Sequence, residues 1–208
     1  MAWFFMLRKS EFLIGLAIRG TDWKRAKRRP ICNTDLLPRR NREFCKWDEE
    51  PDEVVMFLKG SKTDWLNQGA VRNHSALPGA HKNKELCLVS ALVRLFGVYP
   101  GALEGSEPRP IAMYRNGQPI TAYTLARVLK RGVGAHGANP DTVTLHSLRA
   151  GGATALCQST GSMESVRKLG RWKSDAASVY LWESYEQLQG LSGAMASGGH
   201  ELHAASLP

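Results

Sequence analysis

Three helix starts follow one another closely near the end of this 208-residue chain. We expect helices to begin at Thr144, after Ser162 and after Ser174, because serine and threonine side chains cap the first free N–H groups of a helix. Gly170 is expected to end the second helix, since glycine readily adopts the left-handed conformation at a helix end. This run of turns and short helices predicts a mainly helical C-terminal half.

The remaining sequence predicts further helices and one small sheet. Apolar residues at helical spacing indicate helices over residues 2–19 and 85–98, and a third helix that Thr121 caps and that carries Leu125, Val128 and Leu129. The first of these has the stripe Phe12, Leu13, Leu16 and Ala17, with Gly20 as a stop. Residues 52–72 are typical of a β-hairpin, because the apolar run Val54 to Leu58 precedes a turn-forming Lys-Gly-Ser-Lys sequence.

The segment from Cys32 to Leu37 is expected to add a strand, whereas residues 100–119 and 132–139 are rich in turn formers and are expected to be loops. The fold class that follows is α+β, mostly α-helical with a small antiparallel β-sheet. Residues 190–208 hold a Gly/Ala/Ser segment and are expected to form a flexible C-terminal tail.

The charge is strongly positive and uneven. Lys and Arg number 28 against 19 Asp and Glu, which gives a formal net charge of +9. Basic residues concentrate between Lys24 and Lys46 and again between Arg127 and Tyr180. Because a basic domain favours anionic partners, we expect this chain to bind nucleic acid.

The four cysteines form no CxxC pair and stand apart from histidine pairs at zinc-ligand spacing. We therefore expect neither a disulfide framework nor a metal site, and the cysteines are typical of a reducing intracellular compartment. Apolar runs of membrane-spanning length are absent from the sequence, so no membrane partner is expected. No cofactor is expected either.

The residues best suited to chemistry lie in the same C-terminal run. His146 and Arg149 are three apart and therefore neighbours on a helix, where they would flank a core-facing stripe and look into a cleft. Tyr180 follows in the last helix of the run. Cations that hold phosphate oxygens, an imidazole that moves protons and a phenol that attacks are the groups a phosphodiester needs for covalent catalysis. Gly151 and Gly152 cost helix stability, which indicates a close approach of another backbone or of DNA.

Five elements, in this order along the chain, resemble the motifs of the tyrosine recombinase, or phage integrase, family. They are Met6-Leu-Arg8-Lys-Ser-Glu-Phe-Leu13, the hairpin Phe57-Leu-Lys-Gly-Ser-Lys-Thr63, His146-Ser-Leu-Arg149, Leu169-Gly-Arg-Trp172, and Tyr180. The resemblance covers about residues 5–185. Arg171 rather than Trp172 stands nine residues before Tyr180, the usual spacing of the family's His/Trp position, and Trp172 is preferred because an indole donor suits that role.

The resemblance implies a catalytic domain over residues 1–189 without the family's N-terminal DNA-clamping domain. It implies site-specific recombination or integration of double-stranded DNA, as in mobile elements, through a 3′-phosphotyrosine. The implied catalytic set is Arg8, Lys62, His146, Arg149, Trp172 and Tyr180, with Lys59 as the alternative to Lys62. It also implies self-association on DNA as a tetramer and an intracellular location with DNA.

Two other interpretations remain open at this point. Residues 147–170 resemble a helix-turn-helix, so the chain could be a DNA-binding module without catalysis. Because the chain starts abruptly inside an apolar segment, it could also be a decayed, inactive integrase fragment. A covalent DNA–tyrosine adduct distinguishes the catalytic reading from both.

Overall fold

The computed structural model describes residues 1–14, 29–60, 64, 66, 68–78, 86–100 and 107–181. Its helices and strands, in chain order, are α1 (Lys9–Phe12), β1 (Leu36–Arg40), β2 (Glu43–Phe44), β3 (Glu53–Leu58), β4 (Ala70–Ser75), α2 (Leu88–Val98), α3 (Ala122–Ala135), α4 (Leu145–Thr160) and α5 (Met163–Gly170). Short 3-10 helices are η2 (Asn33–Asp35), η5 (Pro140–Thr142) and η6 (Asp175–Tyr180). The predicted class, helices with a small antiparallel sheet, is confirmed. Within the described ranges, none of the helices has the length and apolarity that a membrane crossing requires.

The sheet is antiparallel, with the strand order β2-β1-β3-β4. β3 is central, and Met56 pairs with Leu36 on one side and with Arg72 on the other. The predicted hairpin is therefore confirmed as β3 and β4. The strand predicted over Cys32 to Leu37 begins only at Leu36, because the Asp35 carboxylate accepts a hydrogen bond from the Cys32 N–H at 2.9 Å and closes a turn of 3-10 helix.

Helices α2 and α3 follow the predictions in most respects. α2 buries Leu88, Val89, Leu92 and Phe96 in one hydrophobic core with the sheet. In α3 the Thr121 hydroxyl accepts the Thr124 N–H at 3.1 Å, as expected of a cap. One expectation was wrong: α3 continues through residues 132–135, where a loop was predicted.

The N-terminal segment is not the helix predicted over residues 2–19. Residues 2–6 form turns, Met6 has a left-handed φ of 47°, and α1 is a single turn that ends before an extended Leu13. The predicted positions Leu16, Ala17 and Gly20 lie outside the described residues. Phe5, Met6 and Leu7 are each at most 1% exposed, and three consecutive buried residues cannot all face one side of a surface helix.

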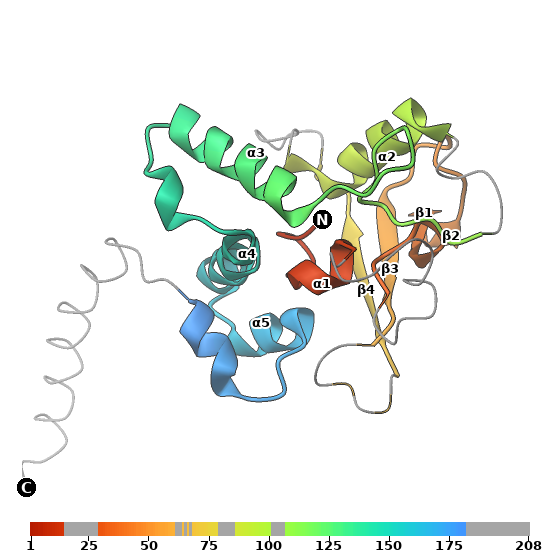
Figure 1. Ribbon diagram of the computed structural model, residues 1–208. Coiled ribbons are helices and arrows are strands. Elements are labelled where there is room, and N and C mark those ends of the chain that lie inside the picture. The colour runs from red at the N-terminus through yellow and green to blue at the C-terminus, as the bar shows by residue number, and fades with distance from the viewer. Residues whose placement is uncertain are drawn as a thin grey trace, which may run out of the picture.

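This segment lies between the sheet and the C-terminal helices (Figure 1). On the sheet side, His74 of β4 makes a 2.8 Å hydrogen bond with the Phe4 carbonyl and packs edge-on against Phe5. On the helix side, a Cβ added to Gly152 of α4 would lie 2.3 Å from the Trp3 carbonyl oxygen. The close backbone approach expected at the glycine pair is therefore present, and a second backbone makes it.

Replacing Gly152 with alanine is expected to lower the free energy of unfolding by about 1–3 kcal/mol, because the added methyl meets a backbone oxygen that cannot move away by itself. Gly151→Ala is the matched control. Its methyl meets only the far edge of the Trp3 ring, which is 42% exposed and can shift. Urea unfolding of both variants measures the difference, and equal stabilities would contradict the packing described here.

Candidate active site

Helix α4 buries Arg149 instead of presenting it to a cleft. Arg149 is 1% exposed, and its guanidinium donates to two backbone carbonyls, that of Met6 and, at 2.7 Å, that of Gly170. His146, one turn earlier, is exposed near the capped start of the helix. Of the two side chains expected to border a cleft, His146 is exposed and Arg149 is buried, so the expectation is wrong for Arg149.

Trp172 lies over Arg149, with the guanidinium carbon 4.0 Å from the ring centroid. The indole is also packed on Gly170, where a Cβ would overlap it at 1.7 Å. Gly170 therefore makes room for Trp172. α5 ends at Gly170, as predicted, whereas the left-handed φ of 61° belongs to the next residue, Arg171.

Tyr180 lies beside both His146 and Trp172. The tyrosine ring centroid is 5.0 Å from that of His146 and 5.3 Å from that of Trp172. The Thr154 hydroxyl of α4 donates to the Tyr180 carbonyl at 3.2 Å and ties the end of η6 to that helix. The structure thus brings together four residues predicted from the sequence: His146, Arg149, Trp172 and Tyr180.

Arg8 reaches this cluster from the other end of the chain through a carboxylate that sequence reasoning missed. Glu11 is 9% exposed. Its oxygens accept from the Arg8 side chain at 3.2 Å, the Arg8 N–H at 2.6 Å and the Arg171 guanidinium at 2.7 Å. The signal in the sequence was an acidic residue one helical turn after Arg8, inside an otherwise apolar stretch.

The two candidates for the residue after Leu169-Gly170 have different surroundings. Trp172 contacts Arg149 and Tyr180. Arg171 instead donates to the Glu11 carboxylate at 2.7 Å and to the Phe5 carbonyl at 3.3 Å. Of these two residues, Trp172 is the one beside the tyrosine, and Arg171 binds α1 and the N-terminal segment.

The cluster is electropositive. Burial, then the charges of Arg8 and Arg171, lower the pKa of Arg149 to about 10 against the opposing effect of Glu11. Burial, then Arg149, then Arg8 lower the pKa of His146 below its ordinary value of 6.5. Arg8 therefore lies close enough to act on both side chains, and His146 is neutral at pH 7.

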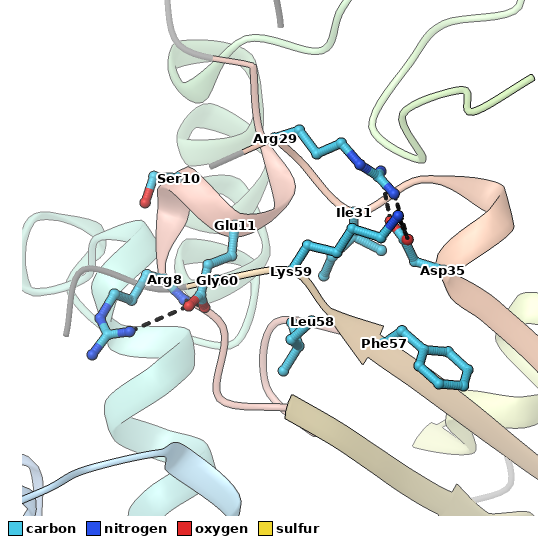
Figure 2. Close-up of a pocket in the computed structure, with 10 residues that line it drawn as sticks. All are labelled: Arg8, Ser10, Glu11, Arg29, Ile31, Asp35, Phe57, Leu58, Lys59 and Gly60. Carbon is cyan, nitrogen blue, oxygen red and sulfur yellow. Dashed lines mark hydrogen bonds and ion pairs between the residues drawn. The ribbon is translucent and has the colours of Figure 1, made fainter. Parts of the chain in front are cut away.

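The lysine pair of the hairpin is described only in part. Lys62 lies outside the described residues. Lys59 follows β3 and extends toward Asp35, with its Nζ 3.9 Å from the carboxylate, while Arg8 points away from that ion pair (Figure 2). Arg29 binds the same carboxylate through two hydrogen bonds of 2.7 and 2.6 Å. Lys59 is thus directed at a structural ion pair and not at Tyr180.

In the part of the chain that the structure describes, no three His, Cys, Asp or Glu side chains gather as a metal ion would require. The expectation that the protein works without a metal or cofactor stays a prediction.

No protein-family model matches this sequence, and no curated protein is significantly similar to it. One solved structure is similar: the XerH site-specific recombinase bound to its difH substrate in a pre-cleavage complex. The sequence identity is 14% and the TM-score 0.47, over 75% of this chain and 40% of the recombinase. Such a similarity assigns neither a role to any residue nor an activity to the chain.

Replacing Arg8 with glutamine is expected to raise the pKa of His146 toward the ordinary histidine value, because one of the two cations that oppose its protonation is removed. An NMR titration of the His146 ring measures the shift. Arg94→Gln, on the exposed face of α2, is the control and should leave the titration unchanged. A His146 pKa that Arg8→Gln does not move would place Arg8 outside this site.

Proposed function

We propose that this chain is a DNA strand transferase of the recombinase type, which cleaves and rejoins double-stranded DNA through a 3′-phosphotyrosine at Tyr180. The observation that carries the proposal is the cluster itself. A half-buried tyrosine lies against a neutral imidazole and beside an indole that covers a buried guanidinium. A nucleophile, a proton acceptor and fixed cations are the parts that covalent phosphoryl transfer requires.

In the proposed step the Tyr180 oxygen attacks a backbone phosphorus, and the bond from phosphorus to the 5′-oxygen breaks. His146 accepts the phenolic proton, and Lys62 donates a proton to the departing 5′-oxygen. A 5′-hydroxyl from another strand then attacks the phosphotyrosine and regenerates the phenol. One phosphoester is exchanged for another at each stage, so the cycle consumes no high-energy cofactor.

The cations act on charge that develops during the attack. Arg8 has its guanidinium held at one end by Glu11 and would grip non-bridging phosphate oxygens with its remaining donors. Arg149 is already bonded to two carbonyls, so its charge would act as a fixed field and as the anchor of Trp172. Trp172 would donate its indole N–H to a phosphate oxygen.

The proposed partner is double-stranded DNA, in keeping with the net charge of +9. Strand exchange between two duplexes requires several protomers, so self-association on DNA, as a tetramer in the family that the motifs resemble, belongs to the proposal. The protein would act where DNA is, inside the cell, in integration or excision of a mobile element. The non-catalytic DNA-binding module and the inactive fragment are the competing readings, and both lack a covalent intermediate.

The first test of this function is a covalent adduct on Tyr180. Incubation with nicked duplexes of randomised sequence, which lose a short fragment once cleaved, should trap protein–DNA conjugates, and peptide mapping should locate the DNA on Tyr180. Tyr180→Phe should reduce the conjugate by at least about 10³-fold, since the nucleophile of a covalent mechanism has no substitute.

Tyr123→Phe is the matched control, because Tyr123 is 74% exposed on α3; it should form the adduct normally. An adduct on Tyr185, or one that survives Tyr180→Phe, would overturn the assignment. DNA binding without any adduct would favour the non-catalytic module.

The second test separates Lys62 from Lys59 as the general acid. On the trapped sequences, Lys62→Ala is expected to slow cleavage by about 10²–10⁴-fold, the usual contribution of a proton donor. A 5′-bridging phosphorothiolate should restore the rate, because sulfur leaves without a proton. Lys59→Ala should show little loss and no such rescue, as its ammonium is directed at Asp35. Selective rescue of Lys59→Ala would reverse the choice.

A further inference from the structure

A second cationic hollow lies next to the proposed active site, between the β3–β4 hairpin and the end of α5. Its volume is about 300 Å³. Five basic side chains line it: Arg72, Arg167, Lys168, Arg171 and Lys173. Among the described lining residues, Asp64 is the single acid, and its oxygens accept the N–H groups of Gln68 and Gly69 at 3.1 and 2.7 Å.

One hydrogen bond connects the two sides of this groove. Arg72 crosses from β4 to α5, where its guanidinium donates to the Lys168 carbonyl at 2.5 Å. Arg167 and Lys168 have acidic partners on their outer sides, Asp175 at 3.4 Å and Glu164 at 3.2 Å. Lys173 is exposed and follows the indole of Trp172 directly in the chain. Arg72, Arg167 and Lys168 are therefore held by bonds within the protein, and Lys173 is the cation most accessible to a ligand.

The floor of the groove is Arg171, whose side chain is 9% exposed. Its two Nη atoms donate to Glu11 and to Phe5, but its buried Nε has no hydrogen-bond partner among the residues that the structure describes. A buried donor without a partner costs about 1–3 kcal/mol. Burial is the main cause that lowers the pKa of Arg171, and the charges of Arg8 and Arg72 lower it further, so Arg72 and Arg171 repel each other. An anion above Arg171 would relieve both unfavourable terms.

Trp172 separates this groove from the tyrosine. The indole lines the groove and packs against Tyr180 and over Arg149. Tyr180 and His146 are not among the described residues that line the groove, so a phosphate bound there does not contact the group that attacks.

We propose that the groove of Arg72, Arg171 and Lys173 binds a second DNA backbone phosphate, distinct from the one that Tyr180 attacks. The inference rests on DNA being the proposed substrate and adds a phosphate subsite to it. Binding there would set the position of the strand relative to Trp172 and Tyr180, since phosphate contacts fix the register of a protein on a duplex.

The test is the salt dependence of binding to a random-sequence duplex, measured in a Tyr180→Phe background so that cleavage plays no part. Each phosphate neutralised contributes about 0.9 to the slope of log affinity against log salt. Lys173→Gln should reduce the magnitude of the slope by about 0.9, and Arg8→Gln should do the same through the scissile position. The double variant should lose about 1.8, because two different phosphates are involved. Arg94→Gln on α2 is the matched control and should change nothing.

A Lys173→Gln slope equal to that of the control would overturn the subsite. The basic residues would then only offset the partial negative charge at the C-terminal end of α5. A double variant that loses no more than either single one would place both residues on the same phosphate, which also overturns it. The subsite and the proposed function fail separately. If Lys173→Gln lowers the salt slope but no Tyr180 adduct forms, the subsite is supported and strand transfer is excluded. If the adduct forms but Lys173→Gln leaves the slope unchanged, strand transfer is supported and the subsite is excluded.

Discussion

The buried guanidinium of Arg149 joins the three parts of the chain that form the candidate site. It begins on α4 and binds a carbonyl of the N-terminal segment and the last carbonyl of α5. Removal of a cation from water costs several kcal/mol unless hydrogen bonds replace the lost hydration. The segment before α1 and the end of α5 therefore have to be in place for Arg149 to be buried, and Trp172 covers it only when they are.

The same interaction determines the electrostatics of the site. Arg149, Arg8 and Arg171 lie close enough to affect one another, and Glu11 is the carboxylate that offsets them. One carboxylate among three guanidinium groups leaves a positive excess that a phosphate can neutralise. Burial is the main cause of the lowered pKa of Arg149 and of His146, and the charges of the neighbouring arginines lower both further. The repulsion among these cations is a cost to stability, as is common where charge is arranged for function.

Local signals predicted the elements whose ends are set by their own side chains. Thr121, Thr144 and Ser162 cap helices where expected, and the β3–β4 hairpin follows the apolar run Val54 to Leu58. The N-terminal segment was mispredicted, because its apolar residues are divided between two partners, β4 and α4, and helical spacing assumes only one. The loop prediction at residues 132–135 failed for a different reason: glycines weaken a helix by only about 1 kcal/mol each, and α3 continues through them.

The sequence by itself determined the chemistry that is available: an imidazole, a phenol, an indole and several guanidinium groups, most of them within residues 146–180. Their spacing along consecutive short helices already restricts how far apart they can lie. The tertiary structure alone decided which of them meet. It placed Arg8 beside His146, turned Trp172 and not Arg171 toward Tyr180, directed Lys59 to Asp35 and buried Glu11 between two arginines. These choices depend on contacts between residues as much as 166 positions apart, where the energy of burying charge, and not local propensity, selects the partner.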